Sequence, residues 1–346
     1  MTAPTAIVHT LPAKAFARAQ RRHFIAAVLL PSLATLAAPW LLPSLWPGSA
    51  AQAALAAVLL LGMWFVVGGI GVSVGLHRHF SHRSFEATPR LRGLLAVCGQ
   101  MAAQGPVTYW VALHRMHHAA SDQRGDPHSP RASAWDGLGP RHAAWRGHLG
   151  WVLSHDVPKP TRYARELIAD TQVRRLGRAY PACVAAGIAV PALLAWALVS
   201  VADAVGDGYG SPGGFVGSTS GATRLWQAAL FGAYWGGVAR IALGHHVIWA
   251  INSLCHLGAA RPHATGDHSS NVGWLALLSW GESWHNNHHA APTAARFGQG
   301  WRQPDIGWWV LRACVALGWA RLRSPIVKTE DARGQDIAAA SGQPSN

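Results

Sequence analysis

The sequence predicts an all-α integral membrane fold, with four transmembrane helices paired as two hairpins and a helical lobe on the cytoplasmic side. Of the 346 residues, 50% are hydrophobic and only 13% are charged, about half the charged share of an ordinary soluble domain. Four apolar stretches each approach the ~20 residues that a helix needs to cross the hydrocarbon core. Lys and Arg are concentrated in the segments on one side of these stretches.

The four apolar stretches define the expected membrane spans. Three prolines interrupt the first stretch, so we expect this helix to be kinked or irregular. A cleaved signal peptide is the alternative for it, because residues 48–50 (Gly-Ser-Ala) resemble a cleavage site. Its apolar region is longer than is typical of a signal, however. The expected spans are residues 24–46, 52–76, 180–201 and 225–251.

The distribution of Lys and Arg predicts the orientation. The segment between the first two spans and the segment 202–223 contain none, whereas residues 77–179 contain fifteen and the chain after Ile251 contains eight. Because basic loops stay on the cytoplasmic side, we expect both termini and the middle of the chain in the cytoplasm. The net charge of +14 then reflects this face of the membrane, and no nucleic-acid partner is expected. The expected divisions are a cytoplasmic N-terminal segment (1–23), a membrane domain (24–328) and a disordered tail (329–346).

Two further apolar segments do not fit as spans. Residues 91–113 include Arg92, Gln100 and Gln104, and residues 301–320 contain a glycine break and an arginine. We expect both segments to lie along the membrane interface or to pack against the cytoplasmic lobe.

Four short runs, three of them rich in histidine, contain the candidate chemistry. They are residues 77–82 (HRHFSH), 114–118 (HRMHH), 252–256 (NSLCH) and 285–289 (HNNHH). Residues three and four apart share a helix face, so each HxxHH run directs three imidazoles the same way. His77 and His82 are five apart and fit the same centre only if the helix ends or is distorted between them.

Together the runs supply nine imidazoles and one amide, which is too many ligands for one metal ion and about right for two. Imidazole suits iron, copper and zinc, and the residues alone do not choose among them. A zinc or nickel transporter is the non-enzyme alternative. Transport sites usually lie near the midplane of the spans, however, whereas these runs lie at the ends of the spans or beyond them.

The runs and their flanks resemble the three histidine boxes of the membrane fatty-acyl desaturases. The similarity extends from about Gly68 to Leu322 and includes GVSVGLHRHFSHRSFEA, WVALHRMHHAASDQRGDPHSP, WAINSLCH and GESWHNNHHAAPTAARFG, in this order. The pattern is most similar to the delta-9, stearoyl-CoA desaturase-like branch, and its WHNNHHA and QGPVTYW stretches resemble bacterial members. A bacterial inner membrane is therefore the expected location.

The resemblance implies a di-iron enzyme that uses O2 to insert a cis double bond into a saturated acyl chain. Removing hydrogen from an unactivated methylene requires a strong oxidant, which a cofactor supplies better than acid–base side chains. Asn252 would act through a water, and His79, at the variable position of the first box, is left out. The implied iron ligands are His77, His82, His114, His117, His118, Asn252, His256, His285, His288 and His289.

The implied reaction also requires two electrons from outside the chain. The sequence has no dinucleotide-binding GxGxxG beside a strand, no iron–sulfur cysteine spacing and no HPGG haem signature. A separate donor is therefore expected, either a ferredoxin or a cytochrome b5-like carrier with its NAD(P)H reductase. The basic cytoplasmic face would attract acidic carriers of this kind.

Five further residues are candidates for supporting roles. Trp110 and Trp249 precede His114 and Asn252 at helical spacing, so we expect them to line the acyl tunnel near the irons; a role as ordinary core tryptophans is the alternative. Ligating imidazoles need partners for their second nitrogen. We assign that role, or a capping role, to Asp126 and His128 of the DPH element, and we expect Glu282 to do the same for the last box.

The carrier of the acyl chain stays open between CoA and lipid. Acyl-CoA members carry basic residues just after a Gly-Trp that follows the second box, but here Gly150-Trp151 is followed by no basic residue until Lys159. A hydroxylase on the same scaffold is the enzymatic alternative, since one hydrogen abstraction followed by oxygen transfer would suffice. The candidates for phosphate contacts are Arg141, Arg146, Lys159 and Arg162.

Overall fold

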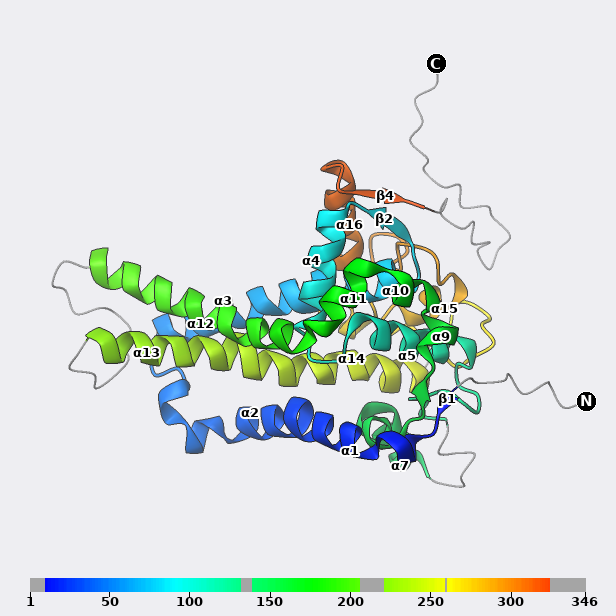
Figure 1. Ribbon diagram of the computed structural model, residues 1–346, viewed down its shortest axis with the longest axis horizontal. Coiled ribbons are helices and arrows are strands. Elements are labelled where there is room, and N and C mark those ends of the chain that lie inside the picture. Colours follow the sequence, from blue (N-terminus) through cyan, green and yellow to red (C-terminus); the bar gives the residue numbers. More distant parts are fainter. Residues whose placement is uncertain (1–9, 132–138, 206–220, 259, 324–346) are drawn as a thin grey trace, which may run out of the picture.

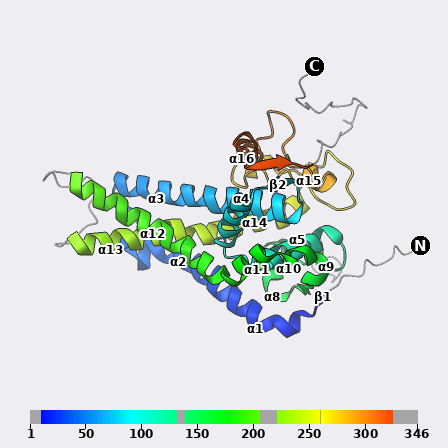
Figure 2. The same ribbon diagram turned by 45° about the horizontal axis from the view of Figure 1, so that its top comes forward.

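The computed structural model describes residues 10–131, 139–205, 221–258 and 260–323. Long helices run side by side at one end of the molecule, and short helices and loops form a lobe at the other (Figure 1). Turning the molecule shows the same division (Figure 2). The predicted, mainly helical fold is therefore observed. The lobe contains two small antiparallel sheets, in which β1 (Thr10–Leu11) pairs with β3 (Val157–Pro158) and β2 (Phe85–Ala87) pairs with β4 (Ala320–Leu322).

Within the described residues, three continuous helices are long and apolar enough to cross a membrane: Ala13–Leu41, Ala50–Ser81 and Tyr180–Ala202. They correspond to the first three predicted spans. The first consists of α1 (Ala13–His23), the π-helical η1 (Phe24–Leu29) and α2 (Leu30–Leu41); the second of α3 (Ala50–Trp64) and the π-helical η3 (Phe65–Ser81); the third lies in α12 (Tyr180–Val205).

The first long helix begins earlier and ends earlier than the predicted span 24–46. It starts directly after Pro12 and continues without a break through the basic residues that precede the apolar stretch. It ends at Leu41, and Pro43 then opens a short 3-10 turn, η2 (Pro43–Leu45). The chain therefore stays helical across residue 24, where the predicted span begins, because residues 13–23 contain no proline or glycine to end the helix.

The second long helix continues past the predicted end at residue 76 to Ser81. It therefore carries the first histidine run within its last turns. The fourth predicted span is also helical, through α13 (Gly221–Gly232), the π-helical η5 (Ala233–Ala239) and α14 (Arg240–Leu257). This helix is not among the three above. Arg240, His245 and His246 make it less apolar, and its crossing of the membrane stays a prediction.

Small residues bring the long helices close together. A Cβ on Gly232 would lie 2.2 Å from the carbonyl oxygen of Pro191 in α12, and one on Gly236 would lie 2.3 Å from the Pro191 side chain. Glycine at these positions therefore allows the helix of α13 and η5 to pack directly on α12. Figures 1 and 2 both show α12 and α13 side by side.

The segment 91–113, expected as one interfacial piece, forms two helices instead. α4 (Pro89–Gln100) packs along η3, and α5 (Val107–Ala119) turns away after Gly105 and Pro106. Gly105 has a φ of 106°, which a glycine adopts without strain, and Pro106 caps the next helix. The segment 301–320 contains α16 (Ile306–Ala316), which also packs against η3.

The remaining short elements complete the lobe. α1 packs against α8, so the N-terminal helix is part of the lobe's surface. The tail expected to be disordered, residues 329–346, lies outside the described residues. The elements are α7 (Pro140–Trp145), η4 (Arg146–Gly150), α8 (Trp151–Ser154), α9 (Pro160–Tyr163), α10 (Arg165–Ala169), α11 (Thr171–Arg178), η6 (Gly273–Leu275) and α15 (His285–Ala290).

Candidate metal centre

The four sequence runs meet in the lobe, at the ends of η3, α5 and α14 and in α15. The first run sits on π-helical backbone, in which the N–H of His82 donates to the carbonyl of His77 at 3.1 Å. A π-helix places residues five apart on nearly the same face. The rings of His77 and His82 are accordingly 4.8 Å apart, and the distortion that their spacing required is observed.

Five histidines form one group, in which one nitrogen from each ring lies within 4.8 Å of the others. They come from η3, from His82 directly after it, from α5 and from α15. The Nε2 atoms of His82 and His114 are 2.7 Å apart. The Nε2 of His288 lies 3.1 Å from that of His77 and 3.0 Å from that of His118. We call these residues the five-histidine group: His77, His82, His114, His118 and His288.

Four histidines form a second group directly beside the first. His256 at the end of α14 brings its Nε2 to 3.1 Å from that of His285, at the start of α15. The ring of His118 stacks on that of His289 at 4.5 Å, so the two groups adjoin. The four-histidine group consists of His117, His256, His285 and His289.

The Nδ1 atoms of four of these rings each contact a carboxylate. Glu282 contacts the Nδ1 of His77 in the five-histidine group. Three aspartates do the same in the four-histidine group, where Asp126 lies 2.9 Å from His117, Asp122 lies 2.7 Å from His256, and Asp267 lies 2.5 Å from His289. A carboxylate on Nδ1 fixes the ring orientation and leaves Nε2 as the free ligand atom.

The sequence pointed to only two of these four carboxylates. Asp122 and Asp267 were not assigned a role, because each reaches a histidine that lies far away along the chain or across a loop. Asp122 has a positive φ of 57° and joins three segments, since it also accepts from the Ser129 hydroxyl at 2.6 Å and the His268 amide at 2.8 Å. His128 lies beside the pair formed by His117 and Asp126, and its expected supporting role stays a prediction. Its ring packs on His117 at 4.4 Å, and its amide donates to Asp126 at 3.0 Å.

The electrostatics favour neutral rings at most positions of the site; His117 is the exception, because Asp126 raises its pKa despite burial. Burial, followed by neighbouring imidazoles, holds the pKa of His114 and His288 well below the usual 6.5. Burial also lowers the pKa of His289, to about 4. The pKa of Asp122 falls to about 2 despite burial, because His256 and Ser129 hydrogen-bond to the carboxylate. Neutral imidazoles beside ionised carboxylates are the protonation state that metal binding needs.

Unpartnered nitrogens show that these groups fit metal ions. His117 Nε2 and His289 Nε2 are buried without a hydrogen-bond partner in the described structure, although their Nδ1 atoms are paired. His288 Nε2 faces two other Nε2 atoms at about 3 Å, and neutral imidazoles alone cannot satisfy all three positions. Converging nitrogen lone pairs of this kind suit a transition metal in each group.

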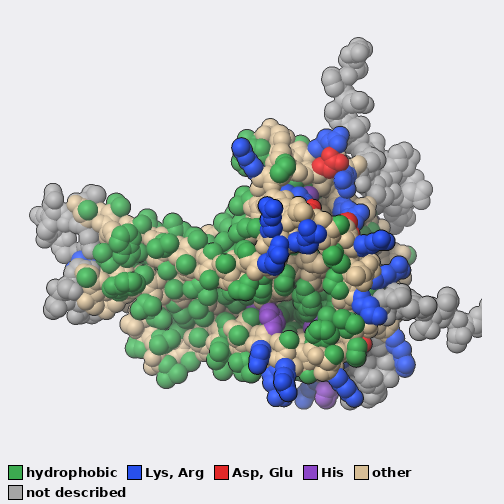
Figure 3. All heavy atoms as spheres, viewed as in Figure 1, with side chains coloured by type: hydrophobic (Ala, Val, Ile, Leu, Met, Phe, Trp, Pro, Cys, Tyr) green, Lys and Arg blue, Asp and Glu red, His purple; other side chains and the backbone are tan. Residues whose placement is uncertain are grey.

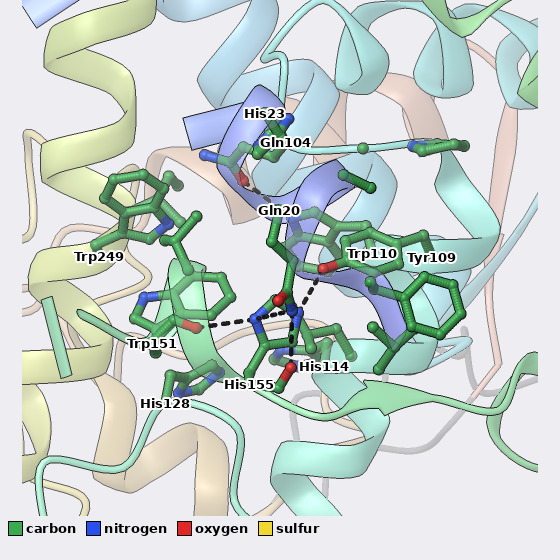
Figure 4. A pocket seen from close by; sticks show the side chains of 18 of the residues that line it. Gln20, His23, Gln104, Tyr109, Trp110, His114, His128, Trp151, His155 and Trp249 are labelled. Atoms are coloured by element: carbon green, nitrogen blue, oxygen red, sulfur yellow. Dashed lines mark hydrogen bonds between the residues drawn. The ribbon is translucent and has the colours of Figure 1, made fainter. Parts of the chain in front are cut away.

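An apolar cavity of about 350 Å³ reaches the five-histidine group (Figure 4). His114, Trp110 and Asn252 line it near the metal groups, and the Trp110 ring stacks on His114 at 5.1 Å. Trp249 lines the opposite side. Asn252 therefore lies on the cavity wall, and its expected role as a ligand through a water stays a prediction.

The N-terminal helix also lines this cavity, which the sequence did not indicate. Gln20 of α1 donates to the carbonyl of His155 at 2.8 Å, and the hydroxyl of Tyr109 lies 2.7 Å from the Nε2 of His155. The candidates for phosphate contacts, Arg141, Arg146, Lys159 and Arg162, are not among the residues that line it. His79 points away from both groups, with its Nδ1 3.2 Å from the carbonyl of Phe85.

Comparison with known proteins gives one family. The family model for fatty acid desaturases matches residues 49–323. A hex-5-enoyl-[acyl-carrier protein] acetylenase of Moorena producens is 35% identical over 303 residues, covering 86% of this chain and 84% of the relative. An sn-1 stearoyl-lipid 9-desaturase of Synechocystis is 31% identical over 272 residues (75% and 69%), and the delta-9 acyl-lipid desaturase 1 of Arabidopsis thaliana is 34% identical over 257 residues (74% and 71%).

Proposed function

Because the chain belongs to the fatty acid desaturase family, whose members are oxidoreductases acting on fatty-acyl chains in membranes, we propose that it inserts a cis double bond at the delta-9 position of a saturated acyl chain. The observation that carries this proposal is the apolar cavity, whose lining includes His114, Trp110 and Asn252. A long apolar substrate lying in it has its methylenes beside the metal groups, with water excluded.

We propose iron as the metal, with one ion in each histidine group, cycling between Fe2+ and Fe3+. When bound, the ions supply the activation of O2 that removal of hydrogen from an unactivated methylene requires. The chain orients four of the ligand rings through carboxylates, and burial favours the neutral form of rings such as those of His114, His288 and His289. The proposed ligands are the nine histidines of the two groups, with Asn252 through a water.

We propose a membrane lipid as the carrier of the acyl chain, with CoA as the alternative. Two of the relatives above are named for acyl-lipid substrates. Among the described residues that line the cavity there is no Lys or Arg to hold the phosphates of CoA. The acetylenase relative is named for an acyl-carrier protein substrate, so a protein carrier is a third outcome of the test below.

We propose a separate electron donor, a ferredoxin or cytochrome b5-like protein with an NAD(P)H reductase. Exposed arginines gather on α1 and α11, on either side of a hollow in the surface (Figure 3). They include Arg18, Arg21 and Arg22 on one side and Arg174, Arg175 and Arg178 on the other. A basic surface attracts acidic electron carriers. It also fits the proposed orientation, with the lobe in the cytoplasm of a bacterium.

Expression in a host that lacks its own desaturase tests the function. Lipid analysis should find a new cis double bond at the ninth carbon, and separation of lipid, CoA and protein-bound acyl chains should identify the carrier. A product heavier by one oxygen atom would instead favour the hydroxylase. Metal uptake without O2 consumption on a fatty substrate would favour the transporter.

The pH dependence of iron retention should follow the lowered pKa values. The ordinary histidine value is 6.5, but burial holds the pKa of His289 at about 4. Between these values, unfolded chains take up protons that the folded site does not, so stability decreases as the pH falls through this window. In folded molecules the rings with a lowered pKa stay neutral, whereas the pKa of His117 in the four-histidine group is raised by Asp126 despite burial. We expect the melting temperature to fall below pH 6.5, while the folded fraction keeps the iron of the five-histidine group, where burial holds the pKa of His114 and His288 well below 6.5. Loss of both ions from folded protein near pH 6.5 would contradict the lowered pKa values.

Replacing a cavity tryptophan should change the position of the double bond. Trp110 stacks on His114 and donates to Gln104 Oε1 at 3.0 Å, and Trp249 packs against Trp151 with ring centres 5.9 Å apart. Trp110→Ala widens the cavity beside His114, and Trp249→Ala widens it on the opposite side, so in either variant the acyl chain can slide. We expect mixed double-bond positions by mass spectrometry. An unchanged profile in both variants would remove these residues from the tunnel.

A further inference from the structure

A second, smaller apolar cavity of about 20 Å³ adjoins the first on the side away from the lobe. Gln104 and Ile248 line both cavities, so the second begins where the first ends. Gln104 is held by the Trp110 indole, which places this junction directly past the five-histidine group. A chain that passes the metal groups therefore runs toward the second cavity.

The indole of Trp280 lines the second cavity. Trp280 is 2% exposed, and its ring packs against that of Trp64, with centres 5.3 Å apart. The ring lies directly on the backbone of η3. A Cβ added to Gly68 would lie 1.9 Å from the indole, and one added to Gly69 would lie 2.9 Å from it. Gly68 is nine residues before His77 in the same helix.

The backbone at Trp280 is held in an unusual conformation. Its φ of 55° is in the left-handed region, which bulky residues rarely adopt, and Gly281 follows with a φ of 97°. The carbonyl of Trp280 accepts from the Gly307 amide at 2.9 Å, which helps to fix this turn. The turn directs the indole into the helix bundle, while Glu282, two residues after Trp280, contacts the Nδ1 of His77. Strained residues of this kind cluster at functional sites.

The other polar group in this cavity is already satisfied. The guanidinium of Arg240 donates to the carbonyls of Met101 at 2.8 Å, Gly187 at 3.0 Å and Gly236 at 3.2 Å. It therefore ties three helical segments together, and each of its three nitrogens already donates to a backbone carbonyl. The rest of the second cavity's lining is mainly apolar, so the cavity suits the methyl end of a hydrocarbon chain.

We propose that Trp280, backed by Trp64, closes the methyl end of the acyl tunnel and limits how many carbons of the substrate extend beyond the reacting bond. This inference rests on the proposed function, since it assigns one end of the same tunnel. Removing the indole opens apolar space at that end. Each further methylene that is then buried should raise affinity about fourfold.

The test uses Trp280→Gly, which removes the indole and suits the positive φ, together with Trp280→Phe. Trp309→Ala, an exposed tryptophan on α16, is the control. Each is expressed in a host without its own desaturase and supplied with saturated acyl chains of increasing length. We expect Trp280→Gly to shift product toward longer chains, with the double bond at an unchanged distance from the carboxyl end. Trp280→Phe should shift it less, and Trp309→Ala should not shift it.

A second measurement separates this inference from the proposed function. Purified wild type and variants, checked for equal iron content, are titrated with free saturated fatty acids of increasing length while the melting temperature is followed. The length that stabilises best should increase in Trp280→Gly. If wild type makes no unsaturated product but this length still increases, the tunnel end is correct and desaturation is wrong. If folded Trp280→Gly, or Trp280→Phe should the first not fold, keeps the wild-type length preference in both assays, the inference is wrong.

Discussion

His285→Ala should abolish product formation and reduce the iron content of the purified protein from two ions per chain to about one. His285 is buried in the four-histidine group, with its Nε2 3.1 Å from that of His256. This group has only four imidazoles, so losing one leaves three protein ligands for its ion. The five-histidine group keeps all its rings and should retain iron. Metal analysis and lipid analysis of the same preparation measure both effects.

His79→Ala is the matched control, because His79 lies in a histidine box but outside both groups. Its ring contacts the carbonyl of Phe85 at 3.2 Å and packs against Phe80 and Phe85. We expect this variant to keep both ions and to make product. Full activity in His285→Ala, or equal iron loss in the two variants, would show that the two groups are not separate metal sites.

The histidine boxes could be predicted from sequence because their geometry is local. In the HRMHH and HNNHH runs, helical spacing alone directs the imidazoles to one side, and the structure shows this in α5 and α15. The five-residue spacing of His77 and His82 required a distortion, and η3 supplies it as π-helical backbone. The apolar stretches likewise indicated the long helices, because hydrophobicity over some twenty residues is a property of the segment itself.

The carboxylates that contact the histidines and the residues that line the cavity could not all be predicted from local sequence patterns, because they depend on contacts between distant segments. Asp122 reaches His256, 134 residues later, and no local pattern records this pairing. The helix α1 has a basic surface that is typical of a cytoplasmic segment, yet Gln20 and His23 on its other face line the cavity. Trp280 depends on a positive φ, which sequence patterns for a tryptophan do not indicate.

Arg78, the second residue of the first box, shows the same limit and has a large expected effect. Its guanidinium is fully buried and donates to Glu282 Oε1 at 2.6 Å, to Asp305 Oδ1 at 2.8 Å and to the carbonyl of Ala295 at 3.0 Å. It also lies 3.9 Å from the ring centre of Phe297. Arg78 thereby joins η3 to the loops before and after α15. It also holds the carboxylate that orients His77.

Arg78→Met should reduce the free energy of unfolding by about 3–5 kcal/mol, because it leaves two buried carboxylates without their cation. Glu282 would then be less well held, so we also expect a lower iron content in the five-histidine group. Denaturation of the purified protein in detergent, with metal analysis of the folded fraction, measures both. Arg78→Lys should rescue little, since one ammonium cannot reach both carboxylates and the carbonyl with the fixed fork of a guanidinium.

Arg83→Met provides the matched control for this loss. Arg83 follows the same box and pairs with Glu166 at 2.6 Å, but its side chain is 51% exposed and that of Glu166 is 39% exposed. Exposed pairs contribute about 1 kcal/mol or less, because water solvates the charges when the pair is broken. The two variants remove the same charge from positions five residues apart, so the difference between their free energies of unfolding isolates the effect of burial. If Arg78→Met were as stable as Arg83→Met, the ion pairs of Arg78 would not hold η3 to the loops around α15.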